Sequence, residues 1–288
     1  MRRPAILLEV LALTAASGSA CNRGDEAARN DTPATAPPVL TVTATDYALE
    51  APDTVPSGLT VVRLVNRGDQ PHAATLVRLD AGKTLPEYIQ AYGEANRARA
   101  ARPDWASFHG GPSALMPQGE GNATLHLQPG NYAWVCFVPG PSGTAHLLEH
   151  NQAHAFVVRP GSGDTTTSAP VPTASLRMLD FSLELDAPLK AGRHVIRVEN
   201  AGVEPHHVLL FKLAPEKTME HVQAWMQSNM QGEPPAAPVG AMAEMSAGTE
   251  AWFEVDLPAG EYVLVCLVAG RDEVPHMAKG MIQHVRVE

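Results

Sequence analysis

Short apolar runs, five to seven residues long and bounded by Gly, Pro or Asn, recur along the chain. Several alternate apolar and polar positions, or are rich in β-branched residues, which is typical of strands that bury one or both faces. The clearest are TVVRLVN (60–66), ATLHL (123–127), HVIRVEN (194–200) and YVLVCLV (262–268). Many short strands with Gly and Pro turns, in units of about 100 residues, predict a mainly β protein built from Greek-key sandwiches.

Two segments follow the helical period instead. The first begins at Thr84, with Glu87 three positions on, which is the pattern of a capping box, and then places apolar residues at spacings of three and four. The second begins at Thr218 and has the same apolar spacing. We expect one short helical insert in each half of the chain.

The two halves of the chain are homologous to each other. DYALEAPDTVPSGLTVVRLVNRGDQPHAATLVRL, from Asp46, aligns with DFSLELDAPLKAGRHVIRVENAGVEPHHVLLFKL, from Asp180, at an offset of 134. QPGNYAWVCFV then aligns with PAGEYVLVCLV at an offset of 130. This second offset also aligns Cys136 with Cys266, His146 with His276 and His154 with His284. The duplication predicts two tandem Greek-key sandwich domains, at 39–159 and 173–288, joined by a linker at 160–172. One continuous body of two sheets is the alternative architecture.

The N-terminal residues differ in composition from both repeats. Residues 1–20 contain two Arg, a mostly apolar stretch and small residues, which is the layout of a secretory signal. The sequence SGSA before Cys21 resembles the lipobox of bacterial lipoproteins, so we expect Cys21 to be lipidated. Secretion with cleavage at Ala20 is the alternative. Residues 21–38 are polar and rich in Pro and Thr, which predicts a flexible tether.

The charge of the chain limits its partners. The formal net charge is -10 and no basic block occurs, which argues against nucleic acid and against electrostatic binding to anionic lipid. The expected signal and the lipidation of Cys21 predict an extracytoplasmic bacterial lipoprotein, on the periplasmic or cell-surface side. Because the chain is acidic, we expect it to contact the membrane only through its N-terminal lipid.

Cys136 and Cys266 occupy equivalent positions in the two repeats. Equivalent positions of separate domains rarely meet, so we do not expect a disulfide between them. Two unpaired thiols in an exported protein indicate another use for the sulfur.

The second repeat surrounds its Cys with further metal-binding residue types. His206 begins a strand, and His276 and Met281 follow Cys266 after ten and fifteen positions. Two imidazoles and a thiolate with a weak axial thioether are the donors of a mononuclear blue-copper site.

These pieces resemble the cupredoxin superfamily, the relatives of plastocyanin and azurin. NAGVEPHHVLLF matches the segment of the first His, PAGEYVLVC the strand that leads to the Cys, and HMAKGM the second His and the Met. The resemblance implies that His206, Cys266 and His276 are equatorial copper ligands and that Met281 is the axial ligand.

The first repeat has a reduced version of this pattern. His72, Cys136 and His146 hold the matching positions, and Asn151 stands where the second repeat has Met281. An amide oxygen can act as an axial ligand, so a second copper centre is expected at these four residues.

Two features depart from the familiar blue-copper pattern or compete with it. Nine residues, 267–275, separate Cys266 from His276, where familiar loops have about two to four. His146, His150 and His154 recur every fourth residue and on a helix would share one face as a three-His metal site, but the alignment of His154 with His284 places His154 in the final strand instead.

No catalytic signature occurs in the chain. His-x-His and His-Cys-His pairs, nucleophile elbows and phosphate-binding loops are absent from the sequence, so we do not expect an enzyme. The resemblance favours one-electron transfer with a redox partner protein. The alternatives are copper storage or delivery with a copper donor or acceptor, and a metal-free binding module.

Overall fold

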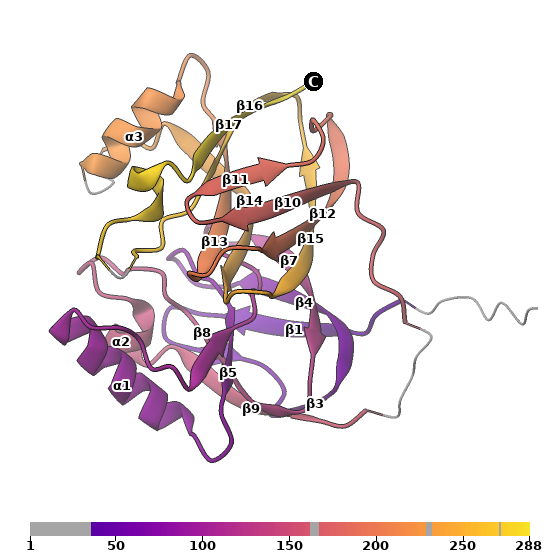
Figure 1. Cartoon of the computed structure of the whole chain (residues 1–288), viewed down its shortest axis with the longest axis vertical. Helices are drawn as coiled ribbons and strands as arrows, with labels where there is room; N and C mark the ends of the chain where they lie inside the picture. Colours follow the sequence, from indigo (N-terminus) through magenta and orange to yellow (C-terminus); the bar gives the residue numbers. More distant parts are fainter. Residues whose placement is uncertain (1–35, 162–166, 229–231, 271) are drawn as a thin grey trace, which may run out of the picture. The chain divides into compact units, whose positions relative to one another are not determined.

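A computed structural model describes residues 36–161, 167–228, 232–270 and 272–288 (Figure 1). The expected signal, the lipidation site Cys21 and most of the tether lie outside these residues. Within the described residues, no helix is both long and apolar enough to cross a bilayer.

The protein is mainly β, as the apolar pattern predicts. The first repeat forms β1 (Val39–Ala44), β2 (Leu49–Glu50), β3 (Thr54–Pro56), β4 (Gly58–Asn66), β5 (Thr75–Leu79), β6 (Ala106–Phe108), β7 (Glu120–Leu127), β8 (Gly130–Val135) and β9 (Ala153–Arg159). The second repeat forms β10 (Ala174–Leu179), β11 (Ser182–Leu185), β12 (Gly192–Asn200), β13 (His206–Leu213), β14 (Ala236–Met245), β15 (Glu250–Leu257), β16 (Gly260–Val265) and β17 (Ile282–Val287). The first three of the apolar runs quoted above lie in β4, β7 and β12, and the fourth begins in β16 and continues three residues past its end.

In the part of the chain that the structure describes, four helical segments accompany the strands, namely α1 (Leu85–Ala98), α2 (His146–His150), α3 (Met219–Gln227) and the 3-10 turn η1 (His276–Lys279). The predicted capping box of α1 is present: the Thr84 N–H donates to Glu87 Oε2 (2.9 Å), and the Glu87 N–H donates to Thr84 Oγ1 (3.4 Å). Tyr88 and Tyr92 of α1 pack on the apolar outer face of the sheet that contains β5 and β8. Val222 of α3 packs in the same way on β13 and β16.

The described strands form three sheets. A five-stranded sheet, β3-β9-β8-β5-β6, belongs to the first repeat, and a four-stranded sheet, β14-β13-β16-β17, belongs to the second. The third sheet, β11-β10-β12-β15-β7-β4-β1-β2, takes four strands from each repeat. The strands of both repeats therefore share one sheet, and the boundaries expected at 39–159 and 173–288 stay a prediction.

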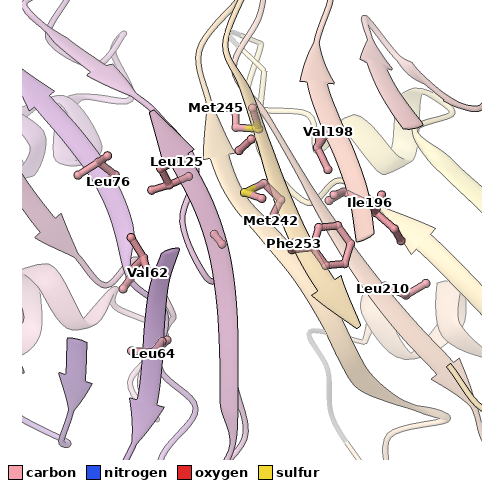
Figure 2. Packing of buried hydrophobic residues seen from close by; sticks show 14 of the residues in the cluster. Val62, Leu64, Leu76, Leu125, Ile196, Val198, Leu210, Met242, Met245 and Phe253 are labelled. Atoms are coloured by element: carbon pink, nitrogen blue, oxygen red, sulfur yellow. The ribbon is translucent and has the colours of Figure 1, made fainter. Parts of the chain in front are cut away.

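A continuous core of buried side chains lies between these sheets. Figure 2 labels Val62, Leu64, Leu76 and Leu125 from the first repeat and Ile196, Val198, Leu210, Met242, Met245 and Phe253 from the second, all members of one buried cluster. Removal of this apolar surface from water is the main stabilising term of such a fold.

The two repeats meet reciprocally in the shared sheet. Thr124 of β7 pairs with Trp252 of β15, and the Asn122 side chain binds both backbone groups of Glu254. Adding the offset of 130 to Asn122 and Thr124 gives Trp252 and Glu254, so each repeat offers the same strand edge to the other. This is the arrangement of an isologous dimer interface within one chain.

A second junction joins the segment after β6 to β14. The Gly110 N–H donates to the Glu244 carbonyl (2.9 Å), and the Ala243 N–H donates to the Gly111 carbonyl (2.8 Å). Pro112 lies opposite Met242 in this pairing, and these two residues are also related by the offset of 130. The same pseudo-two-fold relation therefore describes both junctions.

A buried ion pair strengthens the second junction. Arg102 Nη1 donates to both carboxylate oxygens of Glu244 at 2.6 Å. The guanidinium also lies 5.6, 5.1 and 5.5 Å from the ring centres of Tyr92, Phe108 and Phe137. Burial alone would lower the pKa of Arg102, but the adjacent Glu244 carboxylate raises this pKa overall.

Replacement of Arg102 by Met is expected to destabilise the protein by about 2–4 kcal/mol, because the Glu244 carboxylate would be left buried without its partner. This expected loss of stability is smaller than that for a fully buried ion pair because 34% of the Arg102 side chain is exposed. Urea unfolding measures the change. Arg63→Met is the matched control: Arg63 pairs with Glu120 on the surface, and the loss should stay below about 1 kcal/mol. Equal losses in the two variants would contradict the prediction.

Candidate metal centres

The structure brings the predicted ligands of the second repeat together. His206 is the first residue of β13, Cys266 directly follows β16, and His276 is the first residue of η1. All three side chains are fully buried, and their ligand atoms lie within 4.8 Å of one another. His276 Nδ1 is 2.9 Å from His206 Nδ1 and 3.6 Å from Cys266 Sγ.

Two carboxylates orient the imidazoles. Asp180 Oδ1 accepts from His206 Nε2 (2.7 Å), and Glu204 Oε2 accepts from His276 Nε2 (3.0 Å). A carboxylate on the outer nitrogen places the single proton of a neutral imidazole there and leaves the Nδ1 lone pair free. His206 Nδ1 and His276 Nδ1 then lie 2.9 Å apart with Cys266 Sγ beside them, and these three atoms form a donor set that one metal ion can bind.

A local turn positions both His206 and its carboxylate. Asn200 Nδ2 donates to the carbonyls of Glu204 and Met245, and Asn200 Oδ1 accepts from the Gly202 N–H. A Cβ on Gly202 would collide with the Asp180 carboxylate and the His206 ring, which explains why glycine occupies this position. The Asn-x-Gly pattern of both repeats therefore belongs to the support of the site.

Asp180 is held as an anion. Burial tends to raise the pKa of Asp180, but hydrogen bonds from the N–H groups of Val203 and Glu204 and from the His206 ring lower it overall. The first repeat repeats this arrangement with Asp46, whose Oδ1 accepts from His72 Nε2 (3.0 Å). Sequence reasoning aligned Asp46 with Asp180 but assigned neither a role.

The long loop after Cys266 closes on itself. The Gly270 N–H donates to the Val274 carbonyl (3.0 Å), and the His276 N–H donates to the Val268 carbonyl (2.9 Å). The described residues of the loop thus pair as in a short hairpin, which returns His276 to the end of β16, beside Cys266. Its length does not separate the two ligands.

Met281 is fully buried directly before β17. Its carbonyl accepts from the Cys266 N–H (3.0 Å), and its N–H donates to the His276 carbonyl (3.0 Å). The backbone therefore holds Met281 between Cys266 and His276, two of the candidate ligands.

The first repeat contains the corresponding cluster. His72, Cys136 and His146 are fully buried, with their ligand atoms within 4.8 Å of one another. Cys136 Sγ is 4.0 Å from His72 Nδ1 and 3.6 Å from His146 Nδ1. The Gln70 amide oxygen, rather than a carboxylate, contacts His146 Nε2 (3.1 Å).

Asn151 does not join this cluster. It is exposed and has a left-handed backbone (φ 52°) at the end of α2. The next residue, Gln152, is fully buried, its carbonyl accepts from the Cys136 N–H (3.1 Å), and its N–H donates to the His146 carbonyl (3.2 Å). These are the two backbone contacts of Met281, so the structure corrects the alignment by one residue.

The three-His site on a single helix does not form, and His154 lies in the final strand of its repeat, as the repeat alignment predicts. The helix ends at His150, and His154 lies in β9 with its Nε2 3.3 Å from Asp53. His207, next to a candidate ligand, does not face the site either: its Nε2 accepts the Leu267 N–H (2.8 Å). Burial lowers the pKa of His207 to about 3, which keeps the ring neutral in this contact.

The buried thiols and two of the candidate ligand imidazoles have shifted pKa values, and burial lowers the pKa of His146. Burial raises the pKa of Cys266 to about 12 and that of Cys136 to about 11. Burial also lowers the pKa of His206, against the opposing effect of Asp180. Without metal, each thiol therefore keeps its proton at neutral pH, and a metal ion must displace that proton to form the thiolate bond.

No protein-family model and no curated protein matches the chain. Solved structures to which it is similar include an auracyanin from Roseiflexus castenholzii, at 19% identity over 44% of this chain and 100% of that chain (TM-score 0.31). Auracyanin A, a "blue" copper protein from Chloroflexus aurantiacus, is 16% identical over 42% of this chain and 99% of that chain (TM-score 0.30). A Cu-containing nitrite reductase from Thermus scotoductus is 13% identical over 87% of this chain and 61% of that chain (TM-score 0.21). These scores are low, so the assignment of a metal depends on the side chains of this chain.

Copper binding at Cys266 is expected to strengthen as the pH rises. The thiol pKa lies above the accessible range, so one thiol proton is released per bound ion, and the apparent Kd should fall about tenfold per pH unit between about pH 6.5 and 8. Competitive Cu(I) titration of the full chain with Cys136→Ser, which leaves one cluster intact, measures the slope. Proton release in weakly buffered solution provides an independent check. A pH-independent Kd would contradict the prediction.

Proposed function

We propose that this chain is a cupredoxin-like copper protein that transfers single electrons through a mononuclear centre formed by His206, Cys266, His276 and Met281. The observation that carries the proposal is the buried cluster of two imidazoles and a thiol whose Nδ1 and Sγ atoms converge. These donors fit copper, since thiolate stabilises Cu(I) and imidazole accepts both oxidation states. When bound, copper supplies the one-electron couple.

The residues around the centre keep its geometry nearly constant. Asp180 and Glu204 fix the imidazole rings, and backbone hydrogen bonds fix Cys266 and Met281. Full burial of the ligands excludes water, so no solvent molecule has to reorganise beside the metal. A preorganised site of this kind suits electron transfer, and nothing in it offers an open position for a substrate, so we propose a carrier and not an enzyme.

We further propose that the redox partner is a basic protein on the extracytoplasmic side of a bacterial membrane. The formal net charge of -10 supports electrostatic steering of such a partner. The lipidation proposed at Cys21 would hold the centre near that membrane.

The test is copper loading of the full chain, followed by absorption and EPR spectra and voltammetry. We expect an intense thiolate-to-copper band and a reversible one-electron wave in the Cys136→Ser chain, because this variant keeps the second centre intact. The double variant Cys136→Ser, Cys266→Ser is the matched control and should show neither signal.

Other outcomes would point to other functions. A colourless Cu(I) form of the Cys136→Ser chain that resists oxidation would replace electron transfer with copper storage or delivery. Absence of bound copper in both this variant and the wild-type chain would leave a metal-free binding module.

A further inference from the structure

The first repeat contains an amide group placed where the second repeat has a thioether. Gln152 is fully buried, and its Oε1 lies 3.1 Å from His72 Nδ1. Its Nε2 group donates to the backbone carbonyls of Thr45 and Ala48. Because these two acceptors fix the NH₂ end, the oxygen end of the amide must face the cluster.

The oxygen of Gln152 faces an imidazole nitrogen that has no proton to donate when His72 is neutral and Asp46 accepts from its other nitrogen. The Asp46 carboxylate accepts from His72 Nε2, so the proton of a neutral His72 resides on that nitrogen. His72 Nδ1 then presents a lone pair to another lone pair, that of Gln152 Oε1. A metal ion placed beside both atoms would bind these two lone pairs together, and Cys136 Sγ and His146 Nδ1 converge on the same place.

The backbone gives Gln152 the same relation to the cluster that Met281 has to its own. The carbonyls of Gln152 and Met281 accept from the N–H groups of Cys136 and Cys266, at 3.1 and 3.0 Å. The residues just before them, Asn151 and Gly280, both have positive φ and end the helical turn that starts at the second His ligand.

We propose that Gln152 supplies the fourth donor, an amide oxygen, of a copper centre formed with His72, Cys136 and His146. The chain would then hold two inequivalent centres, one completed by oxygen and one by the Met281 thioether. A hard oxygen donor stabilises Cu(II) relative to Cu(I), whereas a soft thioether does the reverse. The inference uses the copper chemistry of the proposed function but does not depend on electron transfer through the second centre.

The full chain with Cys266→Ser isolates the first centre. Loaded with Cu(II), it is expected to bind one ion through Cys136, with a thiolate-to-copper band that disappears in the double variant Cys136→Ser, Cys266→Ser. Absence of this band in a folded Cys266→Ser chain would overturn the proposal. Failure of the second centre would appear in the Cys136→Ser chain instead, so the two failures are distinguishable.

Substitutions at Gln152 in the Cys266→Ser background test the donor itself. Gln152→Met should favour Cu(I) at least tenfold, which raises the reduction potential by about 59 mV for a one-electron couple. Gln152→Glu keeps an oxygen of similar reach and adds a negative charge, so it should shift the potential in the opposite direction. Asn151→Ala is the matched control and should leave potential and EPR spectrum unchanged.

Opposite shifts of the reduction potential in the two Gln152 variants also distinguish loss of a copper ligand from loss of stability. A general loosening of the site would shift the potential in the same direction in both variants. Unchanged potentials and EPR spectra in both Gln152 variants, or a larger shift from Asn151→Ala, would overturn the assignment of Gln152. Denaturant unfolding of each metal-free variant confirms that only folded chains are compared.

Discussion

Both candidate centres depend on the contact between an aspartate and the outer nitrogen of a histidine. Asp180 accepts from His206 Nε2, and the backbone of the turn that carries His206 donates to the same carboxylate. The turn, the Asp180 carboxylate and the His206 ring therefore form one rigid unit. They can pack this closely because Gly202 has no side chain. If the carboxylate did not hold the outer nitrogen, the Nδ1 lone pair would have no fixed direction, and the thiol and second imidazole would have no common point to meet.

The duplication places this unit twice in one body and joins the two copies close to their sites. Phe137, next to the ligand Cys136, contacts the Arg102 guanidinium, and Arg102 pairs with Glu244. Met245, the next residue after Glu244, pairs through its backbone with His206 in the second centre. The ion pair between the repeats thus lies within a few residues of ligands on both sides, so the junction and the two centres support each other mechanically.

Much of this arrangement could be predicted from the sequence because it depends on local patterns. Strand periodicity located β4, β7, β12 and β16, and the Thr84 capping box located the start of α1. The ligand residues His206, Cys266 and His276 could be identified because they recur in both repeats. Three features depend on contacts distant in sequence and could not be read from it: the hairpin closure of the loop 267–275, the hydrogen bond of Glu204 to a ligand, and the pairing of Gly110 with β14.

The misplacement of Asn151 has a cause in helix geometry. In the second repeat the segment after His276 is a 3-10 turn, and in the first repeat the segment after His146 is α-helical. An α-helix uses 3.6 residues per turn and a 3-10 helix uses 3.0, so the α form needs about one more residue to return the chain to the same point. An alignment of the two repeats at a constant offset of 130 does not account for this extra residue in the first repeat. Asn151 and Gly280, the two residue types that best tolerate a left-handed backbone at a helix end, mark the true correspondence. The inserted residue therefore moves Gln152, instead of Asn151, into the place of Met281, and this shift leaves an amide oxygen facing the first cluster.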